Sequence, residues 1–126
     1  MRVAAAVFVA LSLPLPLLAQ YPKPGRYVAG AGQAGSGASF PQVAVVEKSG
    51  DSTTIRIASP SDSGDNFLPM LDQRAFKSGF ELTLGVVDGG LTCRFAPPNS
   101  SGRWEAMCEN PDHTMLFTFF IDTKEP

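Results

Sequence analysis

The chain has 126 residues and a formal net charge of −2, from ten Lys+Arg against twelve Asp+Glu, with two cysteines and one histidine. The length fits one domain, and the absence of a basic excess disfavours nucleic acid or an anionic membrane as a partner. One histidine, with no HExxH, GxSxG or CxxC motif, disfavours a zinc site or a catalytic triad. We therefore predict that the protein is not an enzyme, and we predict no catalytic, cofactor-binding or metal-binding residues.

Residues 1–19 have the pattern of a secretory signal peptide. Arg2 is followed by the apolar run Val3–Leu18 and by the small residue Ala19, after which cleavage is expected. A membrane anchor is the alternative, but the run is short for a membrane span and has no basic cluster after it. Gln20 stands where a lipoprotein would need cysteine. We therefore expect a secreted or periplasmic protein with neither a lipid anchor nor a transmembrane helix after cleavage.

Residues 20–41 form a segment rich in proline and glycine, for which composition predicts flexibility. A short edge strand is expected at 26–28. The run Gly30-Ala31-Gly32-Gln33-Ala34-Gly35 matches the glycine spacing of dinucleotide-binding proteins. Because no clear buried strand precedes it and no helix can follow it, we interpret the match as coincidental.

The stretch Gln42–Ala58 reads as a β-hairpin because it is rich in β-branched residues. A turn at Ser49-Gly50-Asp51 places Val43 and Val45 opposite Ile57 and Ile55 on the core side. Ala44 and Val46 then point outward. Residues 42–126 as a whole are predicted to form the folded domain.

Two segments follow that interrupt the strand pattern. Ser59–Asn66 reads as a loop, and its Asp62, Asp65 and Asn66 suggest calcium, but turn chemistry explains them better because the spacing is not that of an EF-hand. Phe67–Gly79 is predicted to contain about two turns of helix after Pro69, because apolar residues recur there at helical spacing. Core packing is the favoured role of that helix, and lipid or partner binding is the alternative.

Four alternating strands are expected between Phe80 and Ile121. A turn at Asp88-Gly89 pairs Val86 with Leu91 and Leu84 with Cys93. A second turn, near 99–102, pairs Cys93 with Cys108. A third, at 110–113, pairs Ala106 with Phe117 and Trp104 with Phe119. The inward residues of the whole domain are then Val43, Val45, Ile55, Ile57, Phe80, Leu82, Leu84, Val86, Leu91, Phe95, Trp104, Ala106, Met115, Phe117, Phe119 and Ile121.

The register places the two cysteines directly opposite each other, so a Cys93–Cys108 disulfide is predicted. A reactive thiol is the alternative, and it is disfavoured because no basic group flanks Cys108. Asn99-Ser100-Ser101 is a formal glycosylation acceptor, which matters only in a eukaryotic source.

The sequence predicts an all-β fold with one short helix: an antiparallel meander of six to seven strands forming a small barrel or a half-open sandwich. For function we expect a protein partner, bound by an inhibitor-like module or assembly factor. The expected surfaces are the 59–66 and 97–103 loops or an outward apolar trio of Met107, Leu116 and Phe120, with Met107 opposite Leu116. The alternative is a lipocalin-like carrier of a small apolar ligand, but the large inward residues predict a filled core.

Overall fold

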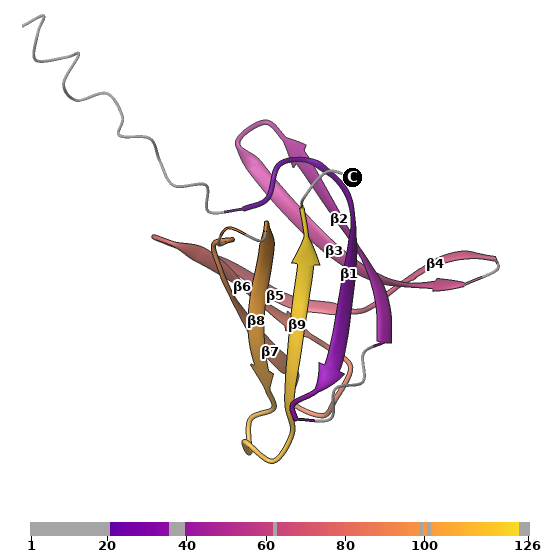
Figure 1. The fold of residues 1–126 in the computed structure, drawn as a ribbon, viewed down its shortest axis with the longest axis vertical. Helices are drawn as coiled ribbons and strands as arrows, with labels where there is room; N and C mark the ends of the chain where they lie inside the picture. The colour runs from indigo at the N-terminus through magenta and orange to yellow at the C-terminus, as the bar shows by residue number, and fades with distance from the viewer. Residues whose placement is uncertain (1–20, 36–39, 62, 99, 101, 124–126) are drawn as a thin grey trace, which may run out of the picture.

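The computed structural model describes residues 21–35, 40–61, 63–98, 100 and 102–123, and the predicted signal peptide lies outside these ranges. The described residues form one curled antiparallel sheet, an incompletely closed barrel, and contain no helix (Figure 1). The fold is all-β, as predicted, with nine strands where six to seven were expected. The strands are β1 (Gly25–Gln33), β2 (Phe40–Ser49), β3 (Ser52–Ser61), β4 (Gly64–Phe67), β5 (Met70–Phe76), β6 (Gly79–Leu84), β7 (Leu91–Ala96), β8 (Arg103–Glu109) and β9 (Leu116–Asp122).

The sheet order is β4-β3-β2-β1-β9-β8-β7-β6-β5, so every neighbouring pair except β1–β9 is also consecutive in the chain. The two edge strands, β4 and β5, are separated only by Leu68 and Pro69. The Leu68 amide donates to the carbonyl of Ile57 in β3 at 2.8 Å, and the Gly85 amide donates to the carbonyl of Pro69 at 2.8 Å. The chain therefore turns at this corner from one end of the sheet to the other, which brings the sheet edges together.

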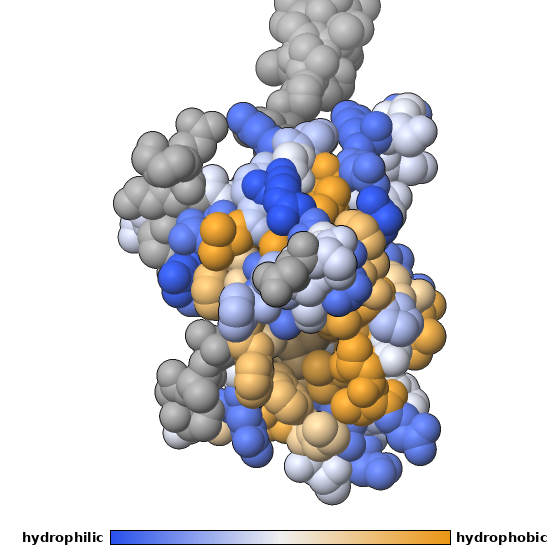
Figure 2. Space-filling model, turned by 90° about the vertical axis from the view of Figure 1, so that its right-hand side faces the viewer, coloured by the Kyte–Doolittle hydropathy of each residue, from blue (hydrophilic) through white to orange (hydrophobic). Residues whose placement is uncertain are grey.

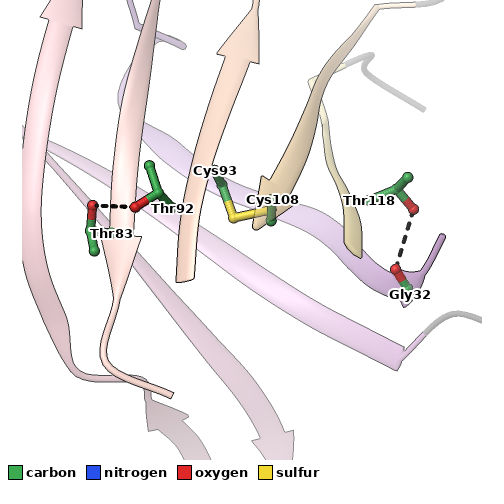
Figure 3. Close-up of a disulfide and its surroundings, with 6 residues drawn as sticks. All are labelled: Gly32, Thr83, Thr92, Cys93, Cys108 and Thr118. Atoms are coloured by element: carbon green, nitrogen blue, oxygen red, sulfur yellow. Dashed lines mark hydrogen bonds between the residues drawn. A yellow bond between two sulfur atoms is a disulfide. The ribbon is translucent and has the colours of Figure 1, made fainter. Parts of the chain in front are cut away.

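The core lies on the concave face, where side chains alternate with solvent-facing ones along each strand. Phe80 stacks on Phe95 with ring centroids 4.6 Å apart, and Trp104 lies 5.3 Å from Phe80. The predicted disulfide between Cys93 and Cys108 is confirmed, and it joins β7 to β8 within this core (Figure 3). The buried core cluster is Ala29, Ala44, Val46, Ile55, Ile57, Phe80, Leu82, Leu84, Leu91, Cys93, Phe95, Trp104, Ala106, Cys108, Phe119 and Ile121.

Gln73 links the edges of the sheet where main-chain pairing is missing. Its side-chain Oε1 accepts a hydrogen bond of 3.0 Å from the Ile55 amide, and its Nε2 donates to the Thr53 carbonyl at 2.7 Å. The same Nε2 contacts the hydroxyl of Tyr21 at 3.1 Å, and the Tyr21 ring packs 5.3 Å from Phe80. Tyr21 and Gln73 together therefore hold β3 near β5.

The predicted helix after Pro69 is wrong, because residues 70–76 form the edge strand β5. The apolar spacing that suggested a helix comes from a strand with an irregular register between Met70 and Asp72. Pro69 is accommodated because it lies at the corner between two edge strands, a place that does not require its missing amide hydrogen. Likewise, the predicted 59–66 loop is mostly strand: it contains the end of β3 and most of β4, paired through Ser59 and Asn66.

The predicted facing of β2 is also wrong. The turn after β2 has two residues, Gly50 and Asp51, since Ser49 pairs with Ser52. The shorter turn moves the register by one residue, so that Ala44 faces Ile57 and Val46 faces Ile55 in the core. A shift of one residue exchanges the two faces of a strand, which sends Val45 to the outer side. Val43 lies on the same side as Val45, opposite Ala58, and is nevertheless buried.

In the hairpins after Phe80, the strand residues face the core as predicted. In two of these hairpins, however, each residue pairs with a partner two positions away from the predicted one. Leu84 pairs with Leu91, because the chain between β6 and β7 is a six-residue loop, 85–90, in place of a two-residue turn. Val86 lies in that loop and is 44% exposed, so its predicted inward position is wrong. Ala106 pairs with Phe119, because the next long loop spans 110–115.

The segment rich in proline and glycine contains the whole of β1, which is longer than the short edge strand expected at 26–28. β1 lies between β2 and β9 and joins the first part of the sheet to the last (Figure 1). Its inward residue Ala29 is buried in the core, while Gly30 and Gly32 alternate with it on the outer side. These glycines leave room for side chains from β9, as described below.

Candidate functional site

The structure separates the predicted outward trio into two locations. Met107 pairs with Thr118 and not with Leu116, and Phe120 pairs with Glu105, all on the outer face of β8 and β9. Leu116 pairs with Glu109 at the far end of the same two strands. Met107 is 52% exposed and Leu116 43% exposed, whereas Phe120 is half-buried.

Phe120 is partly covered because its ring lies on Gly30 of β1. A Cβ atom added to Gly30 would lie 2.5 Å from Cε2 of that ring, so only glycine permits this contact. Two residues further along the same pair of strands, the Thr118 hydroxyl donates to the Gly32 carbonyl at 3.4 Å (Figure 3). A glycine inside a strand commonly marks such a close approach. The outer face of β9 is thus held against β1.

An open groove of about 830 Å³ lies on the outer face of β7, β8 and β9 and includes two of the three predicted residues, Met107 and Phe120. Its shape follows from the register, which places Ala96, Glu105 and Phe120 in one row across the three strands. Small Ala96 leaves a hollow beside larger neighbours. The groove is lined by Ser78, Arg94, Phe95, Ala96, Arg103, Glu105, Ala106, Met107, Thr118, Phe119 and Phe120.

Two arginine–aromatic stacks belong to this groove. The Arg103 guanidinium lies over the Phe120 ring, 4.1 Å from its centroid, and the Arg94 guanidinium lies over Phe76 at 4.1 Å. Each contact is worth about 0.5–1 kcal/mol at an exposed site and limits the freedom of a long side chain. Both arginines are therefore held in place on the surface. Arg103 belongs to the 97–103 segment that the sequence predicts as a binding surface, whereas the two stacks themselves were not predicted.

The charges in the groove are incompletely paired. Arg103 is near Asp122, with 3.8 Å between Nε and Oδ2, and Glu81 pairs with Arg74 at 3.6 Å. Within the described residues, neither Arg94 nor Glu105 forms an ion pair with another side chain. The groove thus presents a cation, Arg94, across from the apolar Met107 and an anion, Glu105, next to Met107 along β8, which suits a partner of opposite pattern.

A second apolar surface lies at one end of the sheet, around Leu116. We call it the apolar end; it comprises Phe40 and the residues of the 67–71 corner, the 85–90 loop and the 110–116 segment. Phe40 and Leu71 are each 59% exposed there. Leu68, Met70, Val87 and Phe117 are partly buried and pack against the core behind them. Figure 2 shows hydrophobic side chains around a hollow on this lower part of the molecule, below the β3–β4 hairpin.

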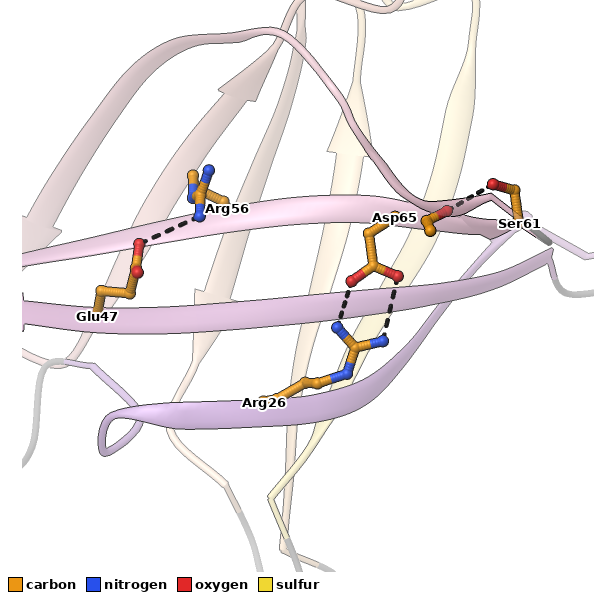
Figure 4. Close-up of polar contacts among 6 residues, drawn as sticks. Arg26, Glu47, Arg56, Ser61 and Asp65 are labelled. Carbon is orange, nitrogen blue, oxygen red and sulfur yellow. Dashed lines mark hydrogen bonds and ion pairs between the residues drawn. The ribbon is translucent and has the colours of Figure 1, made fainter.

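The β3–β4 hairpin, which replaces the predicted 59–66 loop, is fastened to β1 by charge. Arg26 donates two hydrogen bonds to the carboxylate of Asp65, and Arg56 pairs with Glu47 at 3.3 Å on the same side of the sheet (Figure 4). The hydrogen bonds from Arg26 lower the pKa of Asp65 below its ordinary value. The carboxylate of Asp65, one of the residues that suggested a calcium site in the sequence, is therefore bound by the guanidinium of Arg26.

The titratable groups do not assemble into a reactive centre in the part of the chain that the structure describes. The His113 Nδ1 lies 2.8 Å from a carboxylate oxygen of Glu109, and both side chains are at least half exposed. No group of three or more potential metal ligands occurs among the described residues. The two cysteines are joined to each other, so neither is a free thiol.

Comparisons with known proteins give no further guide to the partner. No protein-family profile matches the chain, and neither the curated proteins nor the solved structures contain a significant match. Among the described residues, the structure has no helix with the length and apolar character needed to cross a membrane.

Proposed function

We propose that this protein is an exported, non-catalytic binding module that recognises another protein through the groove on β7, β8 and β9. The observation that carries the proposal is the pair of stacked arginines, Arg94 and Arg103, in one open groove with Met107. Export is supported by the signal-like residues 1–19 and by the disulfide, since disulfides persist in oxidising compartments.

The composition of the groove favours a protein partner. Arginine, methionine and aromatic residues are the types enriched at protein interfaces, and arginine is frequent among residues that dominate binding energy. The stacks also reduce the conformational entropy that Arg94 and Arg103 would otherwise lose on binding, which is a recognised route to affinity. Unpaired Glu105 beside them adds a requirement for a cation on the partner, which provides specificity.

The test compares two variants of matched chemistry in a capture experiment from the exported proteins of the source organism. Met107→Asp places a charge in the groove, and Val28→Asp places the same charge at an exposed position of β1 outside it. We expect one protein to be recovered with the wild type and with Val28→Asp, and to be lost with Met107→Asp. Calorimetry with this protein and the purified partner should then show that Met107→Asp weakens the affinity about tenfold or more. Equal recovery with both variants would exclude the groove as the binding surface.

A carrier of a small apolar ligand is the second candidate, and the partly buried residues of the apolar end favour it. The close contact of Phe80, Phe95 and Trp104 argues against it, because these rings occupy the interior that a ligand would need. The check is a thermal-shift screen with fatty acids, retinoids and an environment-sensitive apolar dye. Stabilisation that saturates and disappears in Ala106→Phe would support the carrier over the binding module.

A further inference from the structure

The apolar end is a composite surface built from segments far apart in the sequence. Leu116 begins β9 and Phe40 begins β2, on either side of the end of β1. Val86 lies in the loop that follows β6, and Leu71 lies against that loop, since a Cβ atom on Gly85 would be 3.3 Å from Cγ of Leu71. Four large hydrophobic side chains are thus exposed by 43% to 59% at one end of the sheet. Exposed apolar side chains gathered in this way usually mark a site of interaction.

The loops of this end are held in place without a ligand. The Asn110 side-chain Oδ1 accepts hydrogen bonds of 2.9 Å from the amides of Thr114 and Met115, which fixes the 110–115 loop. The two long loops also touch, because a Cβ atom on Gly89 would lie 2.7 Å from Cγ of Pro111. A surface that is already ordered loses less conformational entropy when a partner binds.

The charged residues of the loops at this end are acidic, and the one arginine that reaches the end from elsewhere is Arg56, which lies over the Phe67 ring at 4.0 Å and is paired with Glu47. Asp88, Glu109 and Asp112 lie in or beside the two loops. The described segments 33–35, 40–42, 67–71, 84–91 and 109–117 contain no lysine and no arginine. Lys48 and Lys77, by contrast, lie in or beside the turns at the opposite end of the sheet. The only potential cation in these five segments is His113, which is already paired with Glu109.

We infer that the apolar end docks a cationic amphipathic segment of a partner protein. Its apolar side chains would lie against Leu71, Val86 and Leu116, and its lysines or arginines would face the carboxylates of Asp88 and Asp112. Charge complementarity decides between the occupants of an apolar surface, because like charges brought together cost several kcal/mol in general. A fatty acid, an anionic bilayer or a second copy of this acidic end would each bring negative charge to negative charge. This surface is separate from the groove on β7–β9 and does not depend on its function.

The test uses two synthetic peptides of equal length, one of alternating leucine and lysine and one of alternating leucine and glutamate. Each is titrated into the exported protein labelled with ¹⁵N, in low salt, and amide shifts are followed by NMR. We expect saturable binding of the lysine peptide alone, with the largest shifts in the 85–90 and 110–116 segments. The double variant Asp88→Lys, Asp112→Lys should weaken that binding about tenfold, and Met107→Asp should leave it unchanged.

Further experiments test the other molecules that could cover the apolar end: an anionic bilayer, a fatty acid and a second copy of the protein. Vesicles of phosphatidylglycerol and free oleate should not shift these amides, and sedimentation should give a monomer that Leu71→Lys does not alter. Binding of the glutamate peptide with equal affinity, lysine-peptide shifts confined to the groove, or binding of the vesicles or oleate at this end would overturn the inference. Self-association that Leu71→Lys abolishes would also overturn it, because the occupant would then be a second copy.

Discussion

The side-chain amide of Gln73 donates a hydrogen bond of 2.7 Å to the main-chain carbonyl of Thr53, across a gap in the sheet that no main-chain ladder closes. Gln73 also accepts a hydrogen bond from the Ile55 amide. Its side chain thus makes the two hydrogen bonds, one donated and one accepted, that the main chain of a residue in a neighbouring strand would make. A primary amide carries both a donor and an acceptor, which is why this residue type can replace a rung of the ladder.

Replacing Gln73 by glutamate should therefore destabilise the protein. The carboxylate can still accept from Ile55, but it removes the donor to Thr53 and leaves that carbonyl facing a negative charge. A lost partner of this kind costs about 1–3 kcal/mol. Urea unfolding at neutral pH measures the loss, and Lys77→Gln, which makes the same change of charge in the exposed turn after β5, is the control. A Gln73→Glu midpoint equal to that of Lys77→Gln would contradict a closing role for Gln73.

The contact between Gly30 and Phe120 makes a prediction about β1. Gly30→Ala should cost about 1–3 kcal/mol, because the new methyl group would overlap the Phe120 ring unless the strands moved apart. In a Phe120→Ala background the same substitution should cost much less. The double-mutant cycle isolates this pair, and simple additivity of the two changes would show that the contact does not limit position 30.

The Arg26–Asp65 pair predicts a dependence of stability on pH. Because the pKa of Asp65 is lowered in the folded state, its ionised form stabilises the fold above the pKa of an unfolded aspartate, about 4. That stabilisation is lost as the pH falls through the lower, folded-state value. The difference in melting temperature between wild type and Asp65→Asn should thus be largest near neutral pH and shrink in strong acid. In an Arg26→Gln background, which removes the partner, Asp65→Asn should show no such trend.

The disulfide predicts a modest response to reduction. Cys93 and Cys108 are 15 residues apart, for which the chain-entropy estimate gives about 3 kcal/mol. Because the hairpin between β7 and β8 is already local, we expect less than this from the Cys93→Ala, Cys108→Ala double variant. Intact mass with and without reductant and alkylation should show two protons missing from the native protein. Alkylation of both thiols without reductant would contradict the disulfide.

Export predicts cleavage after Ala19, which N-terminal sequencing of the exported protein can check. Cleavage there would leave Tyr21 as the second residue of the mature chain. A mature chain that begins instead after Tyr21 would lack the contacts of Tyr21 with Gln73 and Phe80. That result would contradict the predicted cleavage site.

The sequence predicted the all-β class from alternation within strands, and it predicted the Cys93–Cys108 pair because the expected turn near 99–102 lies at the centre of the 97–102 connection. It placed Leu84 and Ala106 on the correct face but two residues out of register, since alternation does not reveal the length of the 85–90 and 110–115 loops. Val45 was assigned to the wrong face because one residue more or less in a turn exchanges the faces of a strand. In each case the missing quantity was a loop length, which alternation within strands does not encode.

The edge strand β5 and the groove could not be predicted for a different reason. Met70–Phe76 forms a strand because it lies where the two ends of the curled sheet meet, and that position depends on partners distant in the chain. Arg94 and Arg103 acquire their positions from Phe76 and Phe120, on other strands. Met107 and Phe120 were found because they break the outer polar pattern of their strands, and Leu116 was found for the same reason but lies elsewhere.

The strand order has a consequence for how quickly the chain can fold. β1 to β4 and β5 to β9 are two runs of consecutive hairpins, and each hairpin can form from residues close in sequence. Only the β1–β9 pairing joins residues near opposite ends of the chain, so it carries the largest loop-closure entropy. We expect this pairing to form late, so that changes at the β1–β9 seam mainly accelerate unfolding, whereas changes within the β6–β8 hairpins slow the forward reaction.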